Sequence, residues 1–176
     1  MFKEEREVPM FEWGMIGDIK EGRANLGADM DVTIYRMMQF TLRDVLIQRM
    51  GVDLADEVFY AAGREAGRHF YKNVITKKDD FNEMVADLQR ALREYKIGIM
   101  RMEKADLENL RFTIAVAEDL DCSGLPVSNE VVCKYDEGFI SGILNEHTGL
   151  SFNVKEVDCW CSGDRVCRFE AVLETE

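Results

Sequence analysis

The stretch EVDCWCSGDRVCRF, residues 156–169, places three cysteines, a glutamate and a Ser-Gly-Asp turn within fourteen positions. Short runs of alternating character flank the turn, over residues 151–160 and residues 165–173. Alternation with a period of two on either side of a glycine-containing turn is typical of a β-hairpin. The stretch therefore predicts a C-terminal hairpin that carries a cluster of thiols.

The register of this hairpin depends on the length of its loop. If the loop is Ser162–Asp164, with Gly163 at positive φ, Cys159 lies opposite Cys167. Directly opposed residues on one face of a strand pair have Cβ atoms about 5 Å apart. A metal ion could then bridge the two thiols. A two-residue loop would instead place Trp160 opposite Cys167, so the site depends on the longer turn.

Composition limits the function classes. The chain has 176 residues, of which 47% are hydrophobic and 32% charged, as in soluble globular proteins. A net charge of −12 and the lack of a basic stripe argue against nucleic-acid binding. No apolar run approaches the roughly 20 residues of a membrane span. The charged N-terminus lacks a signal-peptide core, so we expect a cytoplasmic protein. Its five cysteines are then expected to be thiols or metal ligands.

Hydrophobic periodicity predicts the order helix, helix, helix, hairpin, helix, hairpin. This order indicates an α+β fold, with about four helices packed on an antiparallel sheet of about four strands. Residues 1–28 are expected to form an N-terminal arm and residues 29–176 the domain. The predicted helices cover residues 31–50, 53–73, from 80 to about 95, and 130–147, and the first predicted strands cover residues 97–103 and 110–117.

Local signals define these helices further. Asp53, Asp80 and Ser128 are predicted to cap the second, third and fourth helices, with Glu83 as the capping-box partner of Asp80. Gly63 and Gly67 lie four residues apart, where another backbone can approach closely. The first helix, residues 31–50, is apolar around most of its circumference, which indicates a central helix or a subunit interface. We prefer the interface, and hence a homodimer.

The cysteines and one glutamate are candidate metal ligands, because zinc sites use thiolate, imidazole and carboxylate donors. By spacing alone the candidates are Cys133, Glu156, Cys159, Cys161 and Cys167. The separation of Glu156 from Cys159 is odd, so both could face one ion only if a bulge lies near residues 157–158. Alternatively, the cysteines are small buried hydrophobes and Glu156 is a solvated strand residue.

The C-terminal half resembles the 4-vinyl reductase domain family. It contains Gly124-Leu125-Pro126, Cys133, Glu156-x-x-Cys159, Gly163-Asp164 and Cys167-Arg168-Phe169, in the family's order and at fitting distances. The resemblance covers roughly residues 30–173 and is specific in the last fifty. The family includes sensor domains of phenol- and xylene-responsive activators and proteins of bacteriochlorophyll biosynthesis, and subunits of the TRAPP trafficking complex share the fold.

The resemblance implies a zinc site formed by Cys133, Glu156, Cys159 and Cys167. Four protein ligands leave no open position, so the zinc is expected to be structural. Cys161 could replace Glu156 as the fourth ligand, whereas Cys122 has no assigned role. An iron–sulfur cluster held by Cys161 and the three other cysteines of the set is the chemical alternative.

The resemblance also implies a buried pocket for a small hydrophobic or aromatic molecule. The positions that correspond to the histidine, tryptophan and tyrosine of the phenol sensors are Met84, Phe112 and Val154, which suggests a ligand less polar than phenol. The expected function is a stand-alone, zinc-stapled sensor or carrier that acts through a regulatory protein partner. A dimeric scaffold without a ligand is the alternative. An enzyme is less expected, and no catalytic residues are assigned, because no nucleotide-binding motif or catalytic triad is found.

Overall fold

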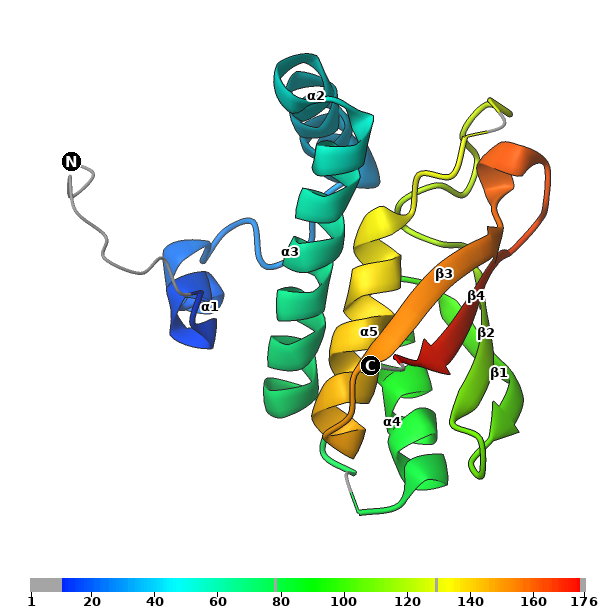
Figure 1. Ribbon diagram of the computed structural model, residues 1–176. Helices are drawn as coiled ribbons and strands as arrows, with labels where there is room; N and C mark the ends of the chain where they lie inside the picture. Colours follow the sequence, from blue (N-terminus) through cyan, green and yellow to red (C-terminus); the bar gives the residue numbers. More distant parts are fainter. Residues whose placement is uncertain (1–10, 78, 129, 175–176) are drawn as a thin grey trace.

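The computed structural model describes residues 11–77, 79–128 and 130–174, and it has the predicted α+β fold (Figure 1). Its four-stranded antiparallel sheet has the order β1-β2-β4-β3. The α5 helix packs on β3 and on α3, and α4 packs on β1. The elements are η1 (Trp13–Ile16), α1 (Ile19–Gly22), α2 (Val32–Met50), α3 (Val52–Asn73), α4 (Phe81–Glu94), β1 (Ile99–Asp106), β2 (Arg111–Ala117), α5 (Lys134–Thr148), β3 (Phe152–Asp158), η2 (Trp160–Ser162) and β4 (Cys167–Leu173).

The two hairpins join into one sheet through β2 and β4. These strands pair antiparallel, with Phe112 opposite Ala171 and Val116 opposite Cys167. The inward side chains of the sheet, among them Phe152 and Phe169, meet the apolar faces of α4 and α5 in the main core. Because β2 lies beside β4, the loop that follows β2 comes close to the start of β4.

Four glycines allow α3 and α5 to pack with their backbones in contact. A Cβ atom at Gly63 or Gly67 would collide with a carbonyl oxygen of α5, and one at Gly138 or Gly142 would collide with a carbonyl oxygen of α3. The close approach predicted at Gly63 and Gly67 is therefore confirmed, and its partner is a matching pair of glycines on α5. This contact fixes α5, and with it Cys133 at its N-cap.

Two predicted helix starts are confirmed and two are wrong. Asp31 caps α2, and Asp80 caps α4 by accepting a hydrogen bond from the Glu83 amide. Asp53 lies inside α3, whose N-cap is Gly51. Ser128 does not cap α5, which starts only at Lys134. The Ser128 amide instead donates to the carbonyl of Cys161, so this segment follows the C-terminal loop rather than the helix axis.

The loop of the C-terminal hairpin is longer than predicted. It includes the 3-10 turn η2, because the Ser162 hydroxyl and the Asp164 amide bind the Cys159 carbonyl and fold the chain back on itself. The predicted register nevertheless holds at the end of the ladder, where Asp158 lies opposite Arg168. The register shifts by one between Glu156 and Asp158, which confirms the bulge predicted there.

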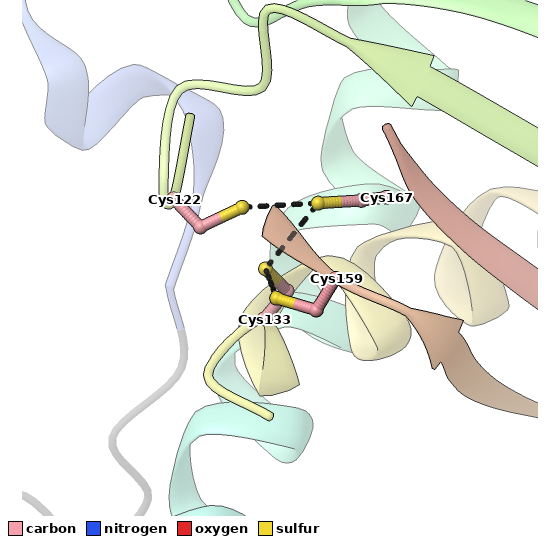
Figure 2. Close-up of side chains that lie close together, drawn as sticks. All are labelled: Cys122, Cys133, Cys159 and Cys167. Atoms are coloured by element: carbon pink, nitrogen blue, oxygen red, sulfur yellow. Dashed lines mark hydrogen bonds between the residues drawn. The ribbon is translucent and has the colours of Figure 1, made fainter. Parts of the chain in front are cut away.

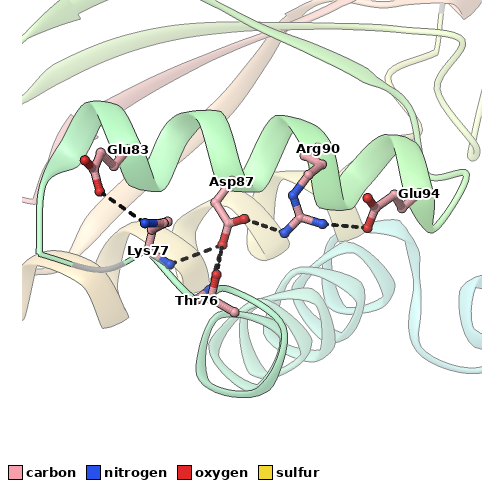
Figure 3. A network of polar contacts seen from close by, with 6 residues as sticks. All are labelled: Thr76, Lys77, Glu83, Asp87, Arg90 and Glu94. Carbon is pink, nitrogen blue, oxygen red and sulfur yellow. Dashed lines mark hydrogen bonds and ion pairs between the residues drawn. The ribbon is translucent and has the colours of Figure 1, made fainter.

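The connection from α3 to α4 is fixed by a buried carboxylate (Figure 3). Asp87 on α4 accepts hydrogen bonds from the amides of Thr76 and Lys77, at 2.7 and 3.2 Å, and from the Arg90 guanidinium. Burial alone would raise the pKa of Asp87, but these donors hold it well below its usual range. The carboxylate therefore contributes to stability as an anion.

The α2 helix is attached mainly by polar contacts. Gln39 is its one buried residue among those described. Its exposed apolar side chains are Val32, Ile34, Met37, Met38, Leu42, Val45 and Met50. In the arm, residues 11–30, Phe11, Met15, Ile16, Ile19, Leu26 and Met30 are also exposed. Residues 1–10 of the predicted arm lie outside the described residues, and the boundary at 28/29 stays a prediction. Among the described residues, no helix combines the length and apolarity that a membrane crossing requires.

Candidate metal centre

Four buried thiols, those of Cys122, Cys133, Cys159 and Cys167, lie within 4.8 Å of one another (Figure 2). The Sγ atom of Cys133 is 4.0 Å from that of Cys159 and 4.0 Å from that of Cys167. Zinc–sulfur bonds of about 2.3 Å in a tetrahedron place sulfurs roughly 3.8 Å apart. Cys122 and Cys167 are closer, at 3.0 Å. All five cysteines are free thiols, so the donors are available.

The four thiols come from three separate parts of the chain. Cys122 lies in the loop after β2, Cys133 is the N-cap of α5, and Cys159 and Cys167 lie at the ends of the C-terminal hairpin loop. The Asp119 carboxylate orders the first of these segments by accepting hydrogen bonds from the amides of Asp121 and Cys122, at 2.9 and 3.1 Å. A bound ion would therefore join the first hairpin, α5 and the second hairpin.

Three of the four predicted ligands, Cys133, Cys159 and Cys167, are brought together, and Cys122 completes the group. Glu156 lies beside the group. It is 8% exposed, and both of its carboxylate oxygens lack a hydrogen-bond partner. Burial, and then the neighbouring Cys159, raise the pKa of Glu156 to about 8. Cys161 is buried but lies outside the group, and burial raises its pKa to about 12.

Sequence reasoning missed Cys122 because it did not predict which strands of the two hairpins pair. Val116, near the end of β2, lies opposite Cys167 at the start of β4. A cysteine shortly after β2 is therefore beside Cys167. The available signal was the fifth cysteine itself, in a loop that directly follows a strand.

Further carboxyl groups surround the thiols. Asp119, Cys133 and Asp136 form a second group whose potential ligand atoms lie within 4.8 Å of one another. Burial, and then the neighbouring Asp121, raise the pKa of Asp119 to about 7. Burial and the nearby Asp119 and Asp121 also raise the pKa of Asp136. Buried acidic groups are costly unless a cation compensates them, so the donor set suits a thiophilic metal ion.

The thiols also differ among themselves. Hydrogen bonds from Cys122, Cys133 and Cys167 lower the pKa of Cys159, which favours a thiolate at the centre of the cluster. The neighbouring thiols raise the pKa of Cys133. Thiolates are the form that binds metals. The cluster thus offers one thiolate readily, and a bound cation would be needed to hold the others deprotonated.

A mostly apolar pocket of about 320 Å³ lies next to this region. It is bounded by the arm, α2, α3, α5 and the loop after β2, and it is lined by Phe11, Trp13, Ile16, Tyr35, Ala66, His69, Phe70, Ile97, Leu120, Asp121, Tyr135, Asp136 and Phe139. The pocket and the thiol cluster therefore share the loop that carries Asp121 and Cys122.

The predicted pocket residues lie elsewhere. Met84 lines a second cavity of about 30 Å³ between α4, α5 and the sheet. Phe112 and Val154 are buried in the main core and line neither cavity. A volume of about 30 Å³ is a single water molecule's share of the liquid. The core cavity as it stands is therefore too small for an aromatic ring.

Comparison with known proteins identifies relatives of this chain. The model of the vinyl-4-reductase domain matches residues 112–173. An uncharacterized protein of Methanocaldococcus jannaschii is 28% identical over 148 residues, which cover 84% of this chain and 81% of the relative. A second uncharacterized protein of the same organism is 24% identical over 119 residues, or 68% of this chain and 65% of the relative.

Solved structures show the same fold at low sequence identity. The phenol-responsive sensory domain of the transcription activator PoxR, solved with phenol, has a TM-score of 0.68 at 15% identity, over 84% of this chain and 78% of that one. A trafficking protein particle complex subunit 3 from Naegleria fowleri, covalently bound to palmitic acid, has a TM-score of 0.64 at 12% identity, over 82% and 95% of the two chains.

A vinyl-4-reductase family protein from Methanocaldococcus jannaschii covers more of the chain. It matches 96% of this chain and 99% of its own, with a TM-score of 0.63 and 16% identity. The described chain therefore has the fold of this family from the arm to the last strand. The resemblance that the cysteine and glycine motifs predicted is confirmed: residues 112–173 are a vinyl-4-reductase domain.

Proposed function

We propose that the protein is a metal-stapled module that binds a small hydrophobic or aromatic molecule in the pocket beneath the arm. The observation that carries this proposal is the pocket itself, which is mostly apolar and has a volume of about 320 Å³. Ligand sites are typically concave, mainly apolar cavities of about 300–1,000 Å³ with a few polar groups. An engineered cavity of about 150 Å³ accepts benzene, so this pocket has room for one or two rings.

The chemistry of the lining supports an aromatic ligand. Trp13, Phe70 and Phe139 offer ring faces and edges, which pack well against other aromatic groups. His69 and Tyr35 supply polar groups near the rim, with His69 in edge contact with Phe11 at a centroid distance of 4.9 Å. The arm contributes part of the wall, so a ligand would hold the arm against α3. Such ordering could be read by a partner protein.

We further propose that the metal is Zn²⁺, held by the four clustered thiolates in a closed, structural site. Closed tetrahedral Cys₄ sites are a common form of structural zinc. Glu156, expected as a ligand from the sequence, is the alternative fourth donor in place of Cys122, since its carboxylate lies beside the thiols without a partner. In either case the ion would join β2, α5 and the second hairpin.

Native mass spectrometry tests both parts of this proposal. The protein is purified without added metal and weighed before and after denaturation. We expect zinc and an additional small organic mass in the native spectrum, both lost on denaturation. Cys122→Ser and Glu156→Gln decide the fourth donor, because replacing the true ligand should lower zinc retention in a chelator competition and replacing the other should not. Zinc-free protein with five free thiols would refute the metal site.

A pair of matched substitutions tests the pocket. Ala66 lines the pocket on α3, whereas Ala62, one turn earlier, is exposed and lines neither cavity. We expect Ala66→Phe to fill the pocket and weaken binding of a fluorescent naphthalene probe at least tenfold. Ala62→Phe should leave probe binding unchanged. Equal probe binding by both variants would exclude this pocket as the ligand site.

The exposed face of α2 favours a second candidate function, a dimeric scaffold. Ile34, Met38, Leu42 and Val45 share one side of the helix and are 45–61% exposed. Contiguous exposed apolar surface of this kind marks interaction sites in soluble proteins. The occupant we propose is α2 of a second copy of the chain. A dimer without any co-purifying small molecule would favour the scaffold over the binding module.

A further inference from the structure

The thiol cluster has a neighbouring group of donors that one ion cannot use. Asp119, Cys133 and Asp136 place a carboxylate oxygen, a sulfur and a second carboxylate oxygen within 4.8 Å of one another. Only Cys133 belongs to both this group and the group of four cysteines. The two aspartates come from different elements, the loop after β2 and the first turn of α5. The fold thus assembles two overlapping donor sets around one sulfur.

The second donor set has an unmet electrostatic demand. The Oδ2 atom of Asp136 is buried and has no hydrogen-bond partner among the described residues. Asp119 uses Oδ1 to accept the amides of Asp121 and Cys122, and its other oxygen remains for a ligand. The nearby guanidinium of Arg36 donates to the backbone carbonyls of residues 119, 120 and 123. A buried carboxylate without a hydrogen bond or a cation is unfavourable.

Asp121, the third aspartate of this region, provides a contrast. Its Oδ1 accepts the Tyr35 hydroxyl at 2.8 Å and its Oδ2 accepts the Gln39 amide at 2.6 Å. Both of its oxygens are therefore satisfied within the protein, and it is absent from the second donor set. The chain thus compensates one buried aspartate with hydrogen bonds and leaves Asp136 aimed at a group that contains a thiol. This difference indicates that Asp136 serves a ligand.

We propose that Asp119, Cys133 and Asp136 form a second divalent-cation site, with the Cys133 thiolate bridging two metal ions. The proposal rests on the proposed four-cysteine site, because the two sites share Cys133. One divalent ion on four thiolates carries a net charge of −2, and two ionised aspartates beside it would be repelled. A second ion removes this repulsion. Mixed oxygen and sulfur donors suit Zn²⁺.

The second site differs from the first in being open. Three protein donors leave a fourth tetrahedral position for water or another small ligand, as in zinc sites that perform chemistry. Asp136 also lines the pocket beneath the arm. The chemical class that would use both features is a small aromatic molecule with a metal-binding group such as a thiol, an imidazole or a hydroxamate.

Metal counting tests the second site. The full-length chain is stripped of metal anaerobically, titrated with Co²⁺ and followed by its thiolate–cobalt charge-transfer absorption, and zinc per chain is measured in parallel. We expect two ions per chain in the parent protein, the second binding more weakly and also changing the thiolate band. Asp119→Asn and Asp136→Asn should each retain one ion, with the second equivalent weakened at least tenfold. The matched control, Asp121→Asn, should retain two.

The outcomes separate the two sites. One ion per chain in the parent protein, with no effect of Asp119→Asn or Asp136→Asn on its affinity, would overturn the second site and leave the first. No ion would overturn both. Two ions that persist in both aspartate variants would place the second ion elsewhere and also overturn the proposal. Because both variants are close to isosteric and each amide keeps an acceptor oxygen, far-UV circular dichroism should show that they remain folded.

Discussion

The inner and outer parts of this molecule use apolar side chains differently. In the inner part, formed by α4, α5 and the sheet, apolar side chains and five thiols are buried within the chain. In the outer part, formed by the arm and α2, most large apolar side chains remain exposed, Met38 at 61% and Leu26 at 76%. The inner part can therefore be stable by itself, whereas the outer part is suited to contact a second molecule.

The two parts meet at one loop, residues 118–124. Tyr35, Arg36 and Gln39 of α2 hydrogen bond to it, and it carries Cys122 into the thiol cluster. This attachment is polar, so it depends on the geometry of the loop more than on buried area. A change at the metal centre is therefore expected to reach α2, while a change on the outer face of α2 should leave the metal centre intact.

The largest effect should follow from breaking the inner part at its thiols. Cys159→Ser removes one of four clustered donors, so we expect loss of the metal and a loss of several kcal/mol in the free energy of unfolding. Cys161→Ser is the control, because Cys161 is equally buried but lies outside the cluster. Metal content and urea denaturation of both variants provide the measurement. Full metal content in Cys159→Ser would contradict the site.

The helix contact should give the next largest effect. A Cβ at Gly67 would collide with the Phe139 carbonyl, and neither backbone can move aside without separating α3 from α5. We expect Gly67→Ala to lower the free energy of unfolding by about 1–3 kcal/mol, the range for overpacked interiors. Gly22→Ala in α1 faces open space and should cost nothing. Equal thermal midpoints for the two variants would show that the close packing is not essential.

The Asp87 network sharpens the comparison through pH (Figure 3). The folded pKa of Asp87 lies below its ordinary value of 3.8, so its contribution is fully present above pH 4 and is lost as the pH falls through the folded value. We expect Asp87→Asn to cost about 1.5 kcal/mol at pH 7 and progressively less below pH 4. Stability differences from urea denaturation at each pH measure this. Glu83→Gln, at an exposed 3.9 Å ion pair with Lys77, should show no such trend.

The sequence predicted what depends on local pattern. Alternation and helical periodicity predicted the order of the elements, and the odd spacing of Glu156 and Cys159 correctly required a bulge. Helix starts at Asp31 and Asp80 were predictable because the capping bond is made within three residues. The same reasoning placed Cys159 and Cys167 together, since both lie on one hairpin.

Features that depend on distant segments were not predictable in this way. Cys122 joins the cluster only because β2 pairs with β4, a pairing that no local pattern encodes. The start of α5 was missed because Ser128 is held by the Cys161 carbonyl, a contact across the fold. The pocket beneath the arm likewise combines residues from five parts of the chain, so positions inferred by counting from the cysteines fell in the core instead.

The smallest effect on stability, and the sharpest test of the outer part, is expected for Leu42→Glu. Leu42 is 52% exposed on α2, so the substitution should change the stability of a single chain by only about 0.5 kcal/mol. If α2 of two copies meet, however, the buried charge should prevent assembly. Light scattering should then give twice the chain mass of 20.2 kDa for the parent protein and a single chain mass for the variant.

The control is Gln48→Glu, which adds the same charge at an exposed polar position of the same helix. It should leave the mass unchanged, because Gln48 is not part of the apolar face. Both variants should keep the metal content of the parent protein, since the α2 contacts with the loop at residues 118–124 come from Tyr35, Arg36 and Gln39. A parent protein that is monomeric at micromolar concentration would exclude self-association, and the exposed face of α2 would then have to serve a different partner.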